Sequence, residues 1–87
     1  MQFEGALLKE QGVKFAIVIV KPYVLQNTFE ADDARRSFAP FFEPGIPIIL
    51  MAQDSRGVPT YQGRRDIVKF LASIDHRRIP WKRYTVS

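Results

Sequence analysis

The chain has 87 residues, of which 46% are hydrophobic and 25% are charged, and it contains no cysteine. This length allows one domain, residues 1–87, and the composition is that of a globular protein rather than a disordered one. The lack of cysteine excludes disulfide bonds, zinc–thiolate sites, iron–sulfur clusters and a cysteine nucleophile.

Two further features bear on where the chain acts. Its longest apolar stretches, 15–20 and 46–52, are far shorter than the ~20 residues of a membrane-spanning helix, so we expect no membrane partner. Residues 1–11 lack the pattern of a secretory signal, which predicts a cytoplasmic location. Residues 56–87 hold most of the basic side chains behind the net charge of +4, and such a positive end favours phosphate-rich partners.

The N-terminal third predicts a short helix followed by a buried strand. Phe3, Ala6 and Leu7 recur at helical spacing, and Gly12 offers a left-handed C-terminal stop for that helix. Residues 13–20 are apolar and rich in β-branched side chains, which is typical of a strand covered on both faces. We expect this strand at or near the centre of the sheet.

A second helix is expected to begin near Thr28. Asn27 and Glu30 have the spacing of a capping box, and Ala31, Ala34 and Phe38 then mark one face. On the other face, Asp32 and Arg36 are expected to form an exposed ion pair.

The remaining chain predicts a hairpin, a closing helix and a last strand. Residues 46–53 read as another buried strand, and a turn at 54–57 leads into a strand at 58–62, placed at a sheet edge because Pro59 lacks an N–H. Gly63 permits a corner before a helix, and residues 81–86 read as a final strand. The expected fold is a small mixed-sheet α/β domain with the order α-β-α-β-β-α-(β).

The segment 45–74 resembles the second half of the thioredoxin and glutaredoxin superfamily. Pro47 would occupy the position of that family's cis-proline, Gly57 the hairpin turn and Gly63 the corner before the closing helix. The resemblance implies a thioredoxin-like layout with helices on both faces of the sheet. The family's first strand and its cysteine site have no counterpart, so redox activity is not expected. The family's central strand is also missing from its usual place, and residues 81–86 could fill that gap as a permuted replacement.

A competing arrangement places the strands 13–20 and 46–53 side by side and parallel. A helical crossover of right-handed sense would connect them, as strand-helix-strand units prefer. Of the two, we favour the thioredoxin-like arrangement.

No catalytic constellation is found in the sequence. His76 is the sole histidine, and it lies in a charged segment typical of a solvated loop. The serines lack a nucleophile elbow, and no glycine-rich phosphate-binding motif occurs. Asp32 and Asp33 are neighbours on a helix and point about 100° apart, which is awkward for joint acid–base or metal chemistry. We therefore expect a protein that is not an enzyme and has no cofactor and no metal.

Three groups of residues are candidates for binding. Lys21, Pro22 and Tyr23 follow the first buried strand, where open α/β sheets tend to hold ligands. Arg64 and Arg65 stand at a helix start, which attracts anions such as phosphate or carboxylate. The third group mixes basic and aromatic side chains, as protein surfaces that bind single-stranded nucleic acid do. It consists of Arg77, Arg78, Trp81, Lys82, Arg83 and Tyr84.

The expected function is that of a small, soluble, non-catalytic interaction module. An edge strand at 58–62 is a natural place for a protein partner to add a strand or for two copies to form a homodimer. The alternative is binding of nucleic acid or another anion through the basic C-terminal third.

Overall fold

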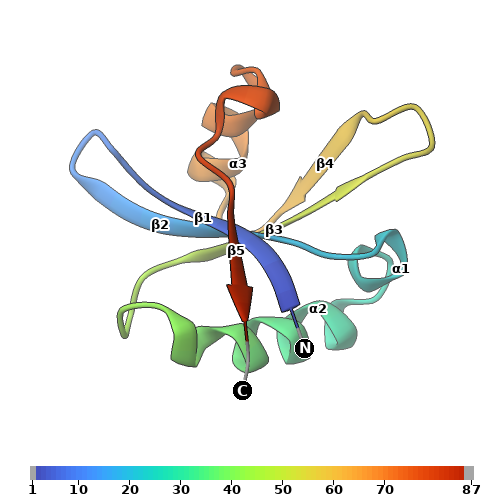
Figure 1. Ribbon diagram of the computed structural model, residues 1–87, viewed down its shortest axis with the longest axis horizontal. Helices are drawn as coiled ribbons and strands as arrows, with labels where there is room; N and C mark the ends of the chain where they lie inside the picture. The colour runs from blue at the N-terminus through green and yellow to red at the C-terminus, as the bar shows by residue number, and fades with distance from the viewer. Residues whose placement is uncertain (1, 86–87) are drawn as a thin grey trace.

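A mixed sheet of five strands with the order β4-β3-β2-β1-β5 runs through the computed structural model, which describes residues 2–85 (Figure 1). The strands β2 and β3 are parallel, and all other neighbours are antiparallel. Since β2 is the middle strand, its predicted central position is confirmed. The strand bounds are β1 Gln2–Glu10, β2 Val13–Ile19, β3 Ile48–Gln53, β4 Pro59–Gln62 and β5 Lys82–Thr85.

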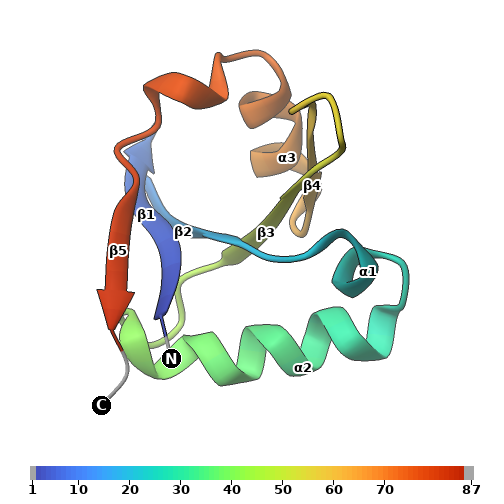
Figure 2. The same ribbon diagram turned by 45° about the vertical axis from the view of Figure 1, so that its right-hand side comes forward.

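Helices cover both faces of the sheet, as expected (Figures 1 and 2). The longer helix α2, Thr28–Phe38, lies under one face together with the short α1, Pro22–Leu25. Helix α3, Arg65–Ala72, packs on the opposite face, and 3₁₀ turns occupy Ala39–Phe41 and His76–Arg78. No helix within residues 2–85 has the length and apolar character that crossing a membrane requires.

Two apolar cores, one on each face, explain why β2 is apolar without a break from Phe15 to Ile19 and β3 from Ile48 to Ala52. Successive side chains of a strand point to opposite faces. Ile17 and Ile49 accordingly join the core under α3, whereas Val18 and Leu50 join the core over α2. All four side chains are fully buried. The prediction of strands covered on both faces is therefore confirmed.

Several local signals fold as predicted. The Asn27 side chain accepts hydrogen bonds from the N–H groups of Phe29 and Glu30 and caps α2 at its start. The residues between β3 and β4 form the expected hairpin turn, and β4 lies at a sheet edge. The predicted pair of Asp32 with Arg36 is wrong, because Asp32 pairs with Arg35 instead.

The predicted N-terminal helix is also wrong, since Gln2–Glu10 forms strand β1. Gln11 and Gly12 have φ angles of 51° and 80°, which build the two-residue turn of a hairpin with β2. Along β1, Phe3 joins the core over α2 and Ala6 the core under α3. The spacing that suggested a helix thus serves two faces of a strand. The element order begins with two strands, so the expected order α-β-α-β-β-α-(β) fails at its first element.

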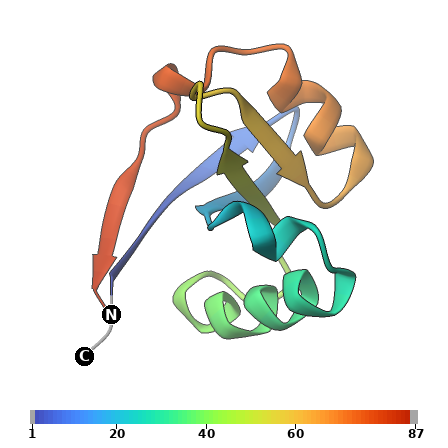
Figure 3. The same cartoon turned by 90° about the vertical axis from the view of Figure 1, so that its right-hand side faces the viewer.

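The other end of the chain returns to this new strand. The predicted last strand is present as β5, which pairs with β1 so that Gln2 lies opposite Thr85 (Figure 3). The parallel pairing of β2 with β3 matches the competing arrangement, whereas the thioredoxin-like order is not confirmed. Pro47 follows a trans bond, so the predicted cis-proline is wrong. In this form the Pro47 carbonyl continues the parallel pairing and accepts from the Ala16 N–H at 2.9 Å.

Candidate functional site

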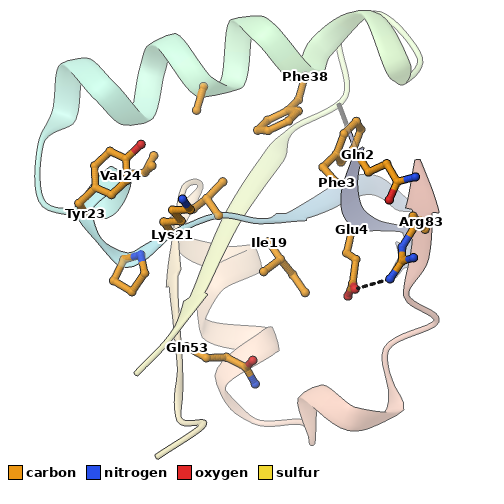
Figure 4. Close-up of a pocket in the computed structure, with 13 residues that line it drawn as sticks. Gln2, Phe3, Glu4, Ile19, Lys21, Tyr23, Val24, Phe38, Gln53 and Arg83 are labelled. Atoms are coloured by element: carbon orange, nitrogen blue, oxygen red, sulfur yellow. Dashed lines mark ion pairs between the residues drawn. The ribbon is translucent and has the colours of Figure 1, made fainter. Parts of the chain in front are cut away.

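An open groove of about 1040 Å³ lies at the end of the sheet where β2 leaves it (Figure 4). Its walls come from the start of β1, the end of β2, helices α1 and α2, and single residues at the ends of β3 and β5. Because β2 and β3 are parallel and end together, the groove stands at the carboxyl ends of the parallel strands.

The floor of the groove is apolar. Ile19 reaches it from the core under α3, and Phe3, Val24 and Phe38 reach it from the core over α2. The Phe3 ring lies 4.7 Å from the Phe38 ring and 4.9 Å from the Tyr84 ring, centroid to centroid. These aromatic contacts fix Phe3, so the floor is held by packing that exists without a ligand.

Polar side chains surround this floor. Lys21 and Arg83 lie on opposite sides of Ile19 (Figure 4), and Glu4 approaches Arg83 with 3.9 Å between Oε1 and Nη2. Gln53 also lines the groove, and its Nε2 lies 3.0 Å from Nε2 of His76. The histidine thus supports a residue of the groove wall from outside.

The three residues predicted from the strand end all line the groove. Lys21, Pro22 and Tyr23 follow β2 directly, and the fixed φ of Pro22 starts α1 at this point. Tyr23 is 58% exposed, which leaves its ring open to a partner. The sequence prediction missed the contribution of β1, because it assigned that segment to a helix.

Arg64 and Arg65 lie at the N-terminal end of α3, outside the groove. The Nε of Arg64 donates to Oδ1 of Asp66 at 2.8 Å, so a carboxylate of the same helix end already occupies this guanidinium. Arg65 is the first residue of α3 and is exposed. Neither residue lines the groove.

The predicted group of basic and aromatic residues near the C-terminus is divided among different surfaces of the protein. Trp81 is anchored, since its indole N–H donates to the His76 carbonyl at 3.0 Å and the ring packs against the core under α3. Arg77 binds the Asp75 carboxylate through Nε and Nη2 at 3.0 and 2.9 Å. The groove takes only Arg83 from the predicted set.

Lys82 and Tyr84 lie on the same face of β5, and the Lys82 Nζ is 5.4 Å from the centre of the Tyr84 ring. Tyr84 stacks on Phe3 with an angle of 5° between the rings. Arg83, between them in sequence, points to the other face and approaches Glu4. Arg78 is exposed within the 3₁₀ turn that precedes this strand.

Two titratable groups near the hairpin have shifted pKa values. Burial raises the pKa of the Tyr61 phenol, and the negative charge of Asp75 adds to this effect. The hydrogen bond from the Arg77 side chain is the main cause that lowers the pKa of Asp75 to about 2. Among the described residues, the Tyr61 hydroxyl is buried without a hydrogen-bond partner. Neither group lines the groove.

The part of the chain that the structure describes holds no group of three His, Asp or Glu side chains placed to bind a metal ion. The chemistry that the groove offers is therefore apolar contact, amide hydrogen bonding and charge. Comparisons of the chain with protein-family models, curated protein sequences and solved structures find no match.

Proposed function

We propose that this protein is a non-enzymatic binding module, which holds a short segment of a protein partner in the groove at the end of the sheet. The observation that carries the proposal is the open apolar floor of Phe3, Ile19, Val24 and Phe38 with the exposed Tyr23 beside it. Apolar side chains of a partner would fill this floor, and polar groups at its sides would fix their orientation.

The size and shape of the groove favour a chain segment over a small molecule. Small-molecule pockets of ~300–1000 Å³ bury most of the surface of their ligand. This groove of about 1040 Å³ is open to solvent, so a small molecule would stay largely exposed. A peptide can lie along such a groove and leave its own backbone polar groups in water.

The two sheet edges support partner binding less well than the groove does. Strand β4, Pro59–Gln62, begins with a proline, and strand β5, Lys82–Thr85, begins with two cations. Proline, lysine and short length are devices by which sheets discourage the addition of another strand. The proposal therefore places the partner in the groove rather than on the edge at 58–62.

A selection from a displayed library of random peptides tests the proposal. We expect the folded chain to enrich peptides with apolar anchors and the Tyr23→Ala variant to lose at least about tenfold in affinity for them. Phe29→Ala is the matched control, because Phe29 is 74% exposed near the same helices but does not line the groove.

Two results would contradict the proposal. One is a selection that enriches no peptide. The other is a set of peptides whose affinity falls equally in Phe29→Ala and Tyr23→Ala, since the groove would then not be the binding surface.

A further inference from the structure

The charges around the groove are arranged on two sides of its apolar floor. Lys21 stands beyond one side of Ile19 and Arg83 beyond the other (Figure 4). Among the groove residues, Glu4 is the one carboxylate, and its oxygen lies 3.9 Å from Arg83. Both side chains of this pair are at least half exposed, so water screens their attraction and leaves Arg83 able to meet another anion.

Strand β5 carries a second cation that lies outside the groove. Lys82 precedes Arg83 in the strand and is exposed, and its Nζ stands over the ring of Tyr84. That ring stacks on Phe3, which belongs to the groove floor. Because successive side chains of a strand point to opposite faces, a segment that leaves the groove over β5 would meet Arg83 and not Lys82, and at the other end it would meet Lys21.

We infer that the segment bound in the groove is acidic, with Asp or Glu side chains on both sides of an apolar anchor. This inference rests on the proposed function and adds the chemistry of the partner. The anchor would lie on Ile19 and Phe3, the acidic side chains at one end would face Lys21, and those at the other end would face Arg83. Charge complementarity of this kind selects partners and speeds their association.

A single-stranded nucleic acid fits the same surface less well. Bases bind by stacking on free aromatic faces, but Phe3 and Tyr84 stack on each other and Trp81 packs against the core under α3. Tyr23 is therefore the one exposed ring among the described groove residues. Glu4 would also repel a phosphate backbone that followed the groove. An acidic peptide avoids both problems, because its charged side chains can reach the cations while its anchor covers the floor.

Three synthetic peptides of about 12 residues test the inference by fluorescence anisotropy at about 50 and 300 mM salt. They share the apolar residues selected from the library and carry Glu, Gln or Lys at the remaining positions. We expect the Glu peptide to bind at least about tenfold more tightly than the Lys peptide at low salt, with a smaller difference at high salt.

Variants with reversed charge test whether Lys21 and Arg83 cause the preference for the Glu peptide. The double variant Lys21→Glu, Arg83→Glu should bind the Lys peptide more tightly than the Glu peptide, and Lys21→Gln, Arg83→Gln should abolish most of the preference. Arg56→Glu is the matched control, because Arg56 also has a carboxylate at 3.9 Å and high exposure but lies outside the groove. It should retain the preference for the Glu peptide, and circular dichroism checks that each variant is folded.

The outcomes separate this inference from the proposed function. Equal affinity for all three peptides would overturn the inference and leave groove binding intact. Failure of all three to bind would overturn the proposed function and the inference with it. The protein could instead bind a thymidine oligonucleotide more tightly than the Glu peptide and lose that binding in the double reversal variant. This result would overturn the inference, because the ligand of the groove would then be nucleic acid and not an acidic peptide.

Discussion

The guanidinium of Arg35 donates from Nη2 to the backbone carbonyl of Gln62 at 2.8 Å and so ties α2 to the end of β4. Its Nη2 also contacts the side-chain Oε1 of Gln62, and its Nε donates to the carbonyl of Ile48 at 2.9 Å. One partly buried side chain thus satisfies carbonyl groups of two neighbouring strands.

Replacement of Arg35 by alanine should lower the free energy of unfolding by about 2–3 kcal/mol, because hydrogen bonds from a charged donor are lost and the carbonyls of Ile48 and Gln62 lose their partner. Arg35→Lys should recover only part of this loss, since an ammonium group lacks the fork that reaches both carbonyls. Urea unfolding followed by circular dichroism measures the change.

Arg36→Ala is the control for this prediction. Arg36 pairs with Asp33 at 3.7 Å on the exposed side of the same helix, so its loss should cost less than about 0.5 kcal/mol. If Arg35→Ala were no more destabilising than Arg36→Ala, the clamp between α2 and the hairpin would contribute nothing to stability.

The role of Arg35 could not be predicted from the sequence, whereas the start of its helix could. Asn27 caps α2 through N–H groups two and three residues ahead, so the signal lies within a short window of sequence. Arg35 instead binds carbonyls 13 and 27 residues away in the sequence. The residues next to an arginine in a helix do not indicate such distant partners. The ion pair of Asp32 was predicted with Arg36 instead of Arg35 for a related reason, because spacing on a helix cannot decide between two competing partners.

The error at β1 shows a second limit. Phe3, Ala6 and Leu7 lie at helical spacing, yet the hairpin turn at Gln11 and Gly12 pairs their segment with β2. Burial on both faces of a strand obscures the alternation that normally reveals it. Lys21, Pro22 and Tyr23 could be found from the end of β2, whereas the residues that β1 and β5 supply depend on pairing between the two ends of the chain.

Gly5 is a sharp test of the β1 assignment. A Cβ at this position would lie 2.9 Å from the backbone oxygen of Ile17 and 3.3 Å from the Tyr84 ring. Gly5→Ala should therefore destabilise the protein by about 1–3 kcal/mol, because β1 must shift away from its neighbours. Thermal unfolding measures this, with Leu7→Ala as a control in the same strand at a side chain that is 45% exposed.

A helix over the same residues predicts the opposite result for Gly5. In a helix, alanine is favoured over glycine, so Gly5→Ala would stabilise the chain. A higher melting temperature for Gly5→Ala would thus contradict the strand.

Tyr61→Phe should leave the stability at pH 7 unchanged or raise it by up to about 1 kcal/mol. The Tyr61 hydroxyl is buried and, within residues 2–85, forms no hydrogen bond, so its removal takes away a polar group that gains nothing from folding. Chemical unfolding at pH 7 measures the difference between the two proteins.

Alkaline pH gives the Tyr61 prediction a second readout. Because burial raises the pKa of Tyr61, the folded state favours the neutral phenol, and the stability linked to it is present below the usual pKa of about 10 and lost as the pH rises beyond it. Wild-type protein should therefore lose stability more steeply above pH 10 than Tyr61→Phe. Parallel losses in the two proteins would contradict burial of the phenol.

Asp75→Asn should lower the melting temperature at neutral pH, and the deficit should disappear in acid. The Arg77 side chain is the main cause that holds the pKa of Asp75 at about 2, below the usual value of about 3.9, so the ionised carboxylate favours the folded state. Its contribution is complete above about pH 5, shrinks as the pH falls through 4 and 3, and is gone below about 2. Melting curves at these pH values check the closing gap between the two proteins.

Arg77→Ala separates the two sources of this low pKa. It removes the bonds from Nε and Nη2 but keeps the bond from the Arg77 backbone N–H, which lies 3.0 Å from Oδ1 of Asp75. The pKa of Asp75, followed by NMR of its carboxyl carbon, should therefore rise in Arg77→Ala yet stay below that of an unpaired aspartate. If the pKa of Asp75 did not change in Arg77→Ala, the backbone N–H of Arg77 alone would account for the low pKa. The part of the stability that depends on ionised Asp75 would then be the same in Arg77→Ala as in the wild type.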